Sequence, residues 1–303
     1  MLLGPGAPCP AVIETLTGSP FGVQLEAGTL PLFDPYGWDP ERGLDAAVEL
    51  LGWRCARTAG GTPAEALDRL RTACGRGPVL AGPLDMGLLL HQPGTPTADG
   101  GDHYVVVLAA DGDTVLLHDP HGHPYVTLPS AVFLDAWRGE SVPYTGEPFV
   151  LRDRFVRERH VPVGEALRRS LPRAVGWLAG RDDLPVRAGT LGGRTAVERL
   201  ASLTDRGLDP GVRAFLTHFA VRVGARRLAD AADCLAGLGL TGAAEAAAGQ
   251  ARALGAVQYP LVVSDDRAAA EALRRLAPGY DRLHDRLRQA LATAPSPAPP
   301  TGA

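Results

Sequence analysis

GDHYVVVLAADGDTVLLHDP, residues 101–120, is the stretch that most determines how this chain folds. Two apolar runs rich in β-branched residues flank the turn signal at 111–113, and this pattern predicts a β-hairpin. Both faces of the first strand, residues 104–110, are apolar. We therefore expect a buried, central strand rather than an edge strand.

Two ionisable residues stand at the open end of this hairpin, His103 before the first apolar run and Asp119 after the second. A three-residue loop at 111–113 places Val105 opposite Asp119. His103 and Asp119 are then diagonal neighbours on one face, roughly 7–8 Å apart at Cβ. A two-residue Asp-Gly loop would put them on opposite faces, because a one-residue slip inverts every side chain. With the longer loop, Asp119 can orient the His103 ring and raise its basicity, as in a catalytic triad.

The bulk composition is that of an ordinary folded protein. The chain has 303 residues, of which 45% are hydrophobic and 21% charged, enough for one large domain or two ordinary ones. A net charge of −4 without a basic stripe argues against a nucleic-acid partner. No run approaches a membrane span, no signal peptide is evident, and four scattered cysteines argue against a disulfide framework. We expect a cytoplasmic protein with reduced thiols.

The character of the sequence changes near residues 146–153. Short strand and helix patterns precede this point, although residues 22–40 read as a loop. Ala/Leu/Arg-rich helical patterns follow it without a convincing strand. The predicted class is α+β, with a small antiparallel sheet in a domain at 1–148 and an all-α domain at 149–294. A Pro/Ala-rich tail at 295–303 is expected to be disordered.

A candidate nucleophile lies far upstream of the hairpin. Cys9 precedes Pro10 and an apolar helical pattern at 11–16, so we expect it to begin a helix. A helix N-terminus favours a thiolate and offers amides for an oxyanion hole. With His103 as base and Asp119 as orienter, Cys9 would complete a Cys–His–Asp set. The alternative is an incidental thiol and a polar pair that only ties down a turn.

Other polar residues have simpler interpretations. His118, Asp119, His121 and His123 form a dense group that could bind a divalent metal, but a solvated turn is favoured. We therefore predict no metal and no cofactor. Asp85, at a strand end, is interpreted as a surface turn carboxylate. The remaining thiols are expected to be packed in the protein interior: Cys55, Cys74 and Cys234.

Four segments together resemble a known family. They are CPAVIETLTGSPF at 9–21, ELLGW at 49–53, GPVLAGPLD at 77–85 and the hairpin at 101–120. The pattern resembles papain-like cysteine peptidases that process bacteriocin leaders and, more closely, the N-terminal domain family of butirosin biosynthesis protein H. The resemblance covers roughly the first half of the chain. The helical second half is similar to the domain that often follows in that group.

This resemblance implies a papain-like fold in which Cys9 is the nucleophile, His103 the base and Asp119 the orienter. It also implies acyl transfer in antibiotic biosynthesis. An acyl group would pass from the phosphopantetheine thioester of an acyl carrier protein to the cysteine and then to a small-molecule amine. Cyclisation or hydrolysis of the thioester are variants. The peptidase relatives carry a Gln shortly before the nucleophile, whereas residues 4–8 contain none.

Two other functions stay open. A cysteine peptidase acting on a peptide ranks lower, because such peptidases are usually fused to an exporter and no membrane segment is evident here. A non-catalytic binding protein on a decayed papain-like fold would explain the missing Gln. The Arg pairs at 168–169 and 226–227 are expected to be solvated, with docking of an acidic carrier protein as the alternative. Helical domains of this kind often pair, so a homodimer is an alternative to a monomer.

Overall fold

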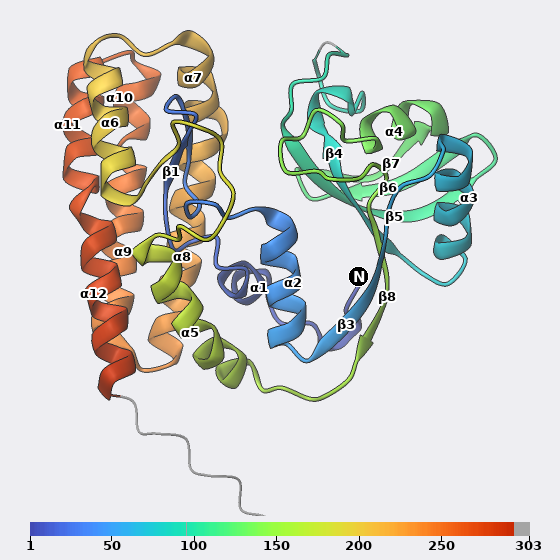
Figure 1. Cartoon of the computed structure of the whole chain (residues 1–303), viewed down its shortest axis with the longest axis horizontal. Helices are drawn as coiled ribbons and strands as arrows, with labels where there is room; N and C mark the ends of the chain where they lie inside the picture. The colour runs from blue at the N-terminus through green and yellow to red at the C-terminus, as the bar shows by residue number, and fades with distance from the viewer. Residues whose placement is uncertain (95, 294–303) are drawn as a thin grey trace, which may run out of the picture. The chain divides into compact units, whose positions relative to one another are not determined.

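The computed structural model describes residues 1–94 and 96–293, which form two compact units (Figure 1). The sheet unit consists of Met1–Ala7 and Gly52–Arg159, and the described part of the helical unit consists of Pro8–Leu51 and residues 160–293. The chain is thus mixed α and β, with antiparallel sheets and a helical C-terminal region, as predicted. The tail expected at 295–303 lies outside the described residues.

The sheet unit is built on a six-stranded antiparallel sheet in the order β3-β8-β4-β5-β6-β7. Two helices pack with the apolar residues of its central strands to form one core. The first helix begins with a capping box formed by Thr62 and Glu65. The elements are η1 (Gly4–Gly6), β3 (Trp53–Thr58), α3 (Pro63–Cys74), β4 (Val79–Asp85), η2 (Met86–Leu88), β5 (Asp102–Asp111), β6 (Thr114–Asp119), β7 (His123–Pro129), α4 (Ser130–Trp137) and β8 (Leu151–Arg157).

The β5–β6 hairpin reaches the predicted register by an unpredicted route. Its loop has two residues, Gly112 and Asp113, one fewer than predicted. A β-bulge at 107–109 places one extra residue in β5 and so restores the alternation of faces beyond it. Val106 therefore lies opposite His118, which is the register that a three-residue loop gives. The strand is central in the sheet, with β4 on its other side.

Strand β8 corrects the prediction that no strand follows residue 149. It lies between β3 and β4, and pairs antiparallel with both. The sequence pattern does not indicate this strand, because charged residues such as Arg152 and Asp153 are usually exposed. In the structure both are buried. Asp153 accepts a hydrogen bond from Arg76 at 2.5 Å, which compensates the burial of its charge.

The helical unit combines a long helical array with a small sheet. Residues 8–51, which we assigned to the first domain, pack here, and the three-stranded sheet β2-β1-β9 means that this unit is not all-α. The elements are α1 (Pro10–Leu16), β1 (Gln24–Glu26), β2 (Leu30–Leu32), α2 (Pro40–Leu50), α5 (Val163–Ala179), β9 (Leu191–Gly192), α6 (Gly193–Asp205), α7 (Pro210–Phe215), a π-helical turn at Leu216–Ala220, α8 (Val221–Gly237), α9 (Thr241–Gly255), α10 (Gln258–Val262), α11 (Asp266–Leu276) and α12 (Pro278–Thr293).

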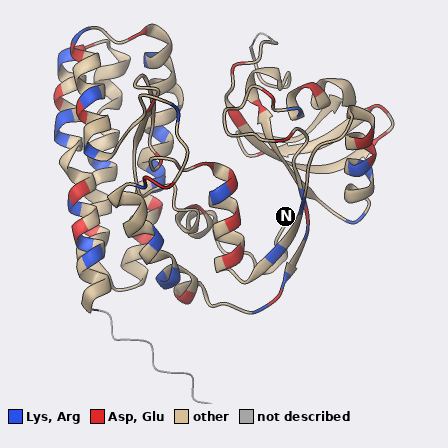
Figure 2. Cartoon of the chain, in the orientation of Figure 1, with Lys and Arg blue, Asp and Glu red and all other residues tan. Residues whose placement is uncertain are grey.

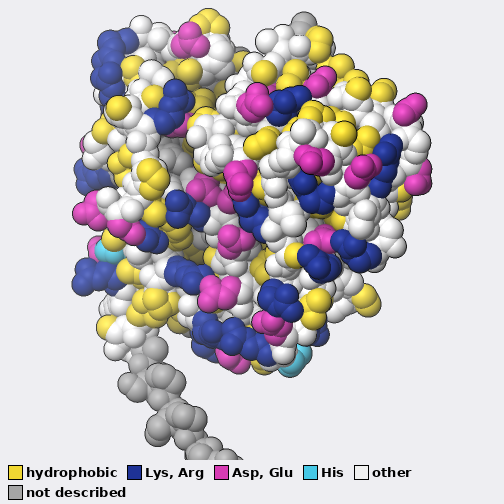
Figure 3. Space-filling view, turned by 45° about the vertical axis from the view of Figure 1, so that its right-hand side comes forward, with side chains coloured by type: hydrophobic (Ala, Val, Ile, Leu, Met, Phe, Trp, Pro, Cys, Tyr) yellow, Lys and Arg dark blue, Asp and Glu magenta, His cyan; other side chains and the backbone are white. Residues whose placement is uncertain are grey.

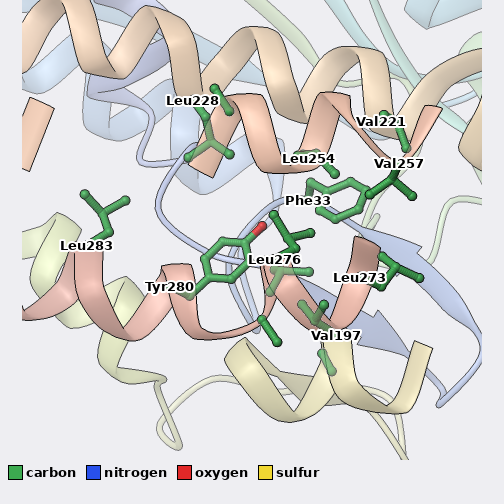
Figure 4. Packing of buried hydrophobic residues seen from close by; sticks show 14 of the residues in the cluster. Phe33, Val197, Val221, Leu228, Leu254, Val257, Leu273, Leu276, Tyr280 and Leu283 are labelled. Atoms are coloured by element: carbon green, nitrogen blue, oxygen red, sulfur yellow. The ribbon is translucent and has the colours of Figure 1, made fainter. Parts of the chain in front are cut away.

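Phe33 links the small sheet to the helical core. Its ring follows β2 and lies among apolar side chains of α8 and α9, including Val221 and Leu254 (Figure 4). Gly224 of α8 makes room for it, since a Cβ there would lie 2.5 Å from Phe33 Cβ and 2.9 Å from Leu254 Cδ2. Residues 22–40, which we predicted to be a loop, thus contain the β1–β2 hairpin. Phe33 anchors this hairpin in the space that Gly224 leaves on α8.

Replacing Gly224 with Ala is expected to destabilise the protein by up to about 2 kcal/mol. The gain in helix propensity is roughly 1 kcal/mol, but overpacking against Phe33 costs about 1–3 kcal/mol. Gly249→Ala in α9 is the matched control, because a Cβ at Gly249 meets nothing within 4 Å. That variant should be slightly stabilised. Chemical denaturation followed by circular dichroism compares them, and equal midpoints for the two variants would contradict the packing argument.

The surface carries mixed charge. Figure 2 shows acidic and basic side chains interspersed along α11 and α12 rather than separated into blocks. The face drawn in Figure 3 likewise mixes Arg, acidic and apolar side chains. Within the described residues, no helix combines the length and the apolar character needed to cross a membrane.

Candidate functional site

His103 and Asp119 meet at the open end of the β5–β6 hairpin. His103 Nε2 lies 2.7 Å from Asp119 Oδ1. The Asp119 side chain has no exposed surface, whereas 13% of the His103 side chain is exposed. A carboxylate only accepts hydrogen bonds, so Nε2 carries the proton and Nδ1 is the ring nitrogen left to act as a base. The predicted imidazole–carboxylate contact is present in the structure.

Three further donors hold the Asp119 carboxylate. The backbone amide of His121 donates to Oδ1 at 2.7 Å. His91 Nε2 and Gln92 Nε2 contact Oδ2 at 2.7 and 2.9 Å. With His103 included, each carboxylate oxygen accepts two hydrogen bonds, which fixes the position of the group completely. The carboxylate therefore holds the His103 ring from a rigid support.

Opposing effects act on the pKa of the Asp119 carboxyl. Burial is the largest and raises this pKa. The hydrogen bonds from His103 and His91, the charge of His103 and the amide of His121 all lower it. Their sum outweighs burial, and the pKa lies well below the ordinary value for Asp. Asp119 is therefore an anion at neutral pH.

Cys9 occupies the predicted place at the start of a helix. It is the N-cap residue of α1, Pro10 is the first helical residue, and the Cys9 side chain is exposed. Cys9 belongs to the helical unit, whereas His103 and Asp119 belong to the sheet unit. The structure thus brings His103 and Asp119 together as predicted, and the pairing of Cys9 with them stays a prediction.

The helix that carries Cys9 is firmly attached to α8. Glu14 forms ion pairs with Arg226 at 3.0 Å and with Arg227 at 2.8 Å. Arg226 also contacts Asp230 at 2.8 Å. The Arg pair that we interpreted as a solvated face, with carrier-protein docking as the alternative, is therefore engaged within the unit. Its charge is used to hold α1.

Cys9 is the one exposed thiol among the four cysteines. Burial, and then the charge of Asp111, raise the pKa of the Cys74 thiol to about 11. Burial also raises the pKa of the Cys234 thiol. Both effects disfavour the reactive thiolate at these two positions. The chemistry of the thiols thus favours Cys9 as the residue that an electrophile reaches first.

The histidines around the β6–β7 turn do not assemble a metal site. His118 precedes Asp119 in β6, so their side chains lie on opposite faces of the strand. The His118 ring lies beside Tyr125, with ring centres 6.4 Å apart. The His121 ring lies 6.1 Å from that of His103. Among residues 1–94 and 96–293, no group of three or more His, Cys, Asp or Glu side chains is placed to hold a metal ion.

Asp85 is buried, which corrects its interpretation as a surface carboxylate. It accepts hydrogen bonds from the amides of Gly87, Asp99 and Gly100, at 2.9, 3.3 and 3.0 Å, and from the Ser141 hydroxyl. Asp85 thereby fixes the loop that enters β5. This carboxylate positions the strand end that carries the candidate base.

Sequence reasoning missed His91 and Gln92. They follow η2 in a short turn, in which the Gln92 amide donates to the Leu89 carbonyl at 3.0 Å. Leu89 is buried and anchors this turn in the core of the sheet unit. The only sequence signal was a His-Gln pair directly after an apolar residue, and no periodicity relates that pair to Asp119.

Comparison with known proteins finds similarity in part of the chain. The YobF C-terminal domain family matches residues 186–288, which lie in the helical unit. The uncharacterized protein YobF of Bacillus subtilis (strain 168) is 32% identical over 136 residues. That match covers 45% of this chain and 44% of the relative, so the chain spans less than half of the relative's length. The name of this relative states no activity.

Proposed function

We propose that this protein is a cysteine-dependent acyl-processing enzyme that acts in the biosynthesis of a natural product. Cys9 takes an acyl group from the thioester of an acyl carrier protein and passes it to a small-molecule amine, to an internal nucleophile or to water. No metal or cofactor takes part. The enzyme works in the cytoplasm, where its thiols stay reduced.

The observation that carries this proposal is the support of His103 by Asp119. Asp119 is fully buried, accepts four hydrogen bonds and contacts His103 Nε2 at 2.7 Å. A strand-end pair that only tied down a turn would not need a carboxylate held by donors on both oxygens. A base whose ring is held in one tautomer needs such a carboxylate. The exposed thiol of Cys9 is the nucleophile that best suits this base.

The chemistry proceeds in two halves. His103 Nδ1 accepts the Cys9 proton as Sγ attacks the thioester carbonyl, and the pantetheine sulfur leaves as a thiol with that proton. The acceptor amine then attacks the acyl-cysteine, His103 takes a proton from the nitrogen, and Cys9 leaves as a thiol. Asp119 stabilises the imidazolium formed in each half. Pro10 has no amide, so the Cys9 amide is the nearest backbone donor for the oxyanion.

The test is the intact mass of the protein after incubation with a panel of acyl-pantetheine thioesters, followed by peptide mapping. The expected result is the mass of one acyl group on Cys9 with at least one thioester, removed when an amine acceptor is added. Binding of thioesters without any adduct would support the non-catalytic alternative. Cleavage of a peptide without reaction of thioesters would support the peptidase.

A further inference from the structure

A second imidazole shares the Asp119 carboxylate. His91 Nε2 lies 2.7 Å from Oδ2, the same distance that separates His103 Nε2 from Oδ1. Both rings must donate Nε2–H, since the carboxylate only accepts. One negative charge therefore faces two rings that can each take up a proton at Nδ1. Protonation of both would leave a net positive charge in a buried site, so the two rings compete.

The surroundings of the two rings are different. The His91 side chain is 5% exposed, and its Nδ1 is buried without a hydrogen-bond partner among the described residues. A proton on that nitrogen would place a charged N–H where no described group accepts it. The His103 side chain is 13% exposed, and its Nδ1 is not among the buried unpartnered atoms. A proton is therefore accommodated more easily on His103 than on His91.

We infer that the two histidines have separate roles: His91 is a positioning residue that donates to Asp119 and stays neutral, while His103 alone takes up the proton. His91 also moderates the base. Its hydrogen bond withdraws negative charge from the carboxylate, and this weakens the hold of Asp119 on a protonated His103. The catalytic role of His103 rests on the proposed function. The difference in protonation between His91 and His103 rests only on the surroundings of the two rings and their shared carboxylate.

The other titratable groups around this pair are few in the described structure. The rings of His121 and His123 lie 6.1 Å from His103 and 5.5 Å from His91, respectively. Asp102 precedes His103 in β5 and accepts a hydrogen bond from Tyr144 at 2.9 Å. Asp85 pairs with Asp102 in the strand register and is occupied by its own four donors. His121 also contacts Asp119 through its backbone amide, which donates to Oδ1 at 2.7 Å.

The test is NMR titration of the histidine rings in the full-length protein, which needs no substrate. In the wild type, His103 should titrate, while His91 should keep its Nε2–H tautomer across the range in which His103 changes. His91→Leu removes the donor and should move the His103 midpoint to higher pH by roughly 0.5–1 unit. His91→Gln, whose amide can still donate to Asp119, should restore most of the wild-type midpoint.

His123→Leu is the matched control, because it removes a ring beside His91 without removing a donor to Asp119. Its His103 midpoint should equal that of the wild type. Protonation of His91 before His103, or an unchanged His103 midpoint in a folded His91→Leu variant, would overturn the inference. Should His91→Leu fail to fold, the wild-type tautomers and His91→Gln still decide it. A protein that forms no acyl-enzyme but shows these titrations would refute the proposed function and leave this inference intact.

Discussion

Cys9→Ala is expected to abolish acyl-enzyme formation and turnover, with a loss of at least about 10³-fold in kcat/KM. Cys9 carries the exposed thiol at the start of α1, and Ala removes this thiol while leaving the helix start otherwise unchanged. Because the Cys9 side chain is exposed, the free energy of unfolding should not fall. Mass spectrometry of the thioester reaction and the thermal midpoint measure the two quantities separately.

The matched control is Cys55→Ala, since Cys55 lies in strand β3 and its thiol is partly exposed. It should retain the adduct on Cys9. A second readout tests whether Cys9 works with His103. Alkylation of Cys9 by iodoacetamide near pH 6 should slow in His103→Ala if the imidazole assists the thiol. Full turnover by Cys9→Ala, or equal alkylation rates in the wild type and His103→Ala, would refute the proposed catalytic set.

The hairpin shows how far local sequence patterns reach. The two strands and the contact of His103 with Asp119 follow from alternation and a turn signal, and both are present. The turn itself has one residue fewer than predicted, and the bulge at 107–109 compensates. A run of small and β-branched residues gives no sign of where an extra residue enters. The prediction that His103 and Asp119 share one face of the hairpin was therefore correct, although the predicted loop length was wrong.

Long-range contacts account for what the sequence did not reveal. His91 reaches Asp119 because the preceding Leu89 is buried in the sheet unit, and no spacing rule joins residues 28 positions apart. Strand β8 escaped notice because its buried Arg152 and Asp153 look solvent-facing in the sequence. Residues 8–51 pack with helices more than a hundred residues downstream, an arrangement that local periodicity does not encode. Each miss concerns a partner supplied by a distant segment.

Asp119→Asn should lower kcat by roughly 10²–10⁴-fold, because an amide at this position can hold His103 in the wrong tautomer. Asn presents one acceptor and one donor where the site offers donors on both sides. At least one of the contacts to His103, His91, Gln92 or the His121 amide must then be lost. Steady-state kinetics measures the effect, and a change in KM with an unchanged kcat would show that Asp119 does not orient the base.

The same variant should also change how stability depends on pH. Folding lowers the pKa of the Asp119 carboxyl below its unfolded value of about 3.9. The stabilisation is therefore fully present above about pH 4, and it is lost as the pH falls toward the folded pKa. In that acid range the unfolded chain binds a proton that the folded protein excludes, so the wild type should lose stability more steeply than Asp119→Asn.

Urea denaturation between about pH 3 and 7 tests this difference in slope. Asp113→Asn, in the exposed turn of the same hairpin, is the matched control and should follow the wild-type curve. Near pH 7, Asp119→Ala should cost about 3 kcal/mol or more, because it leaves buried donors without an acceptor. Parallel curves for the wild type and Asp119→Asn would mean that the carboxylate is not held as an anion. The support proposed for His103 would then be absent.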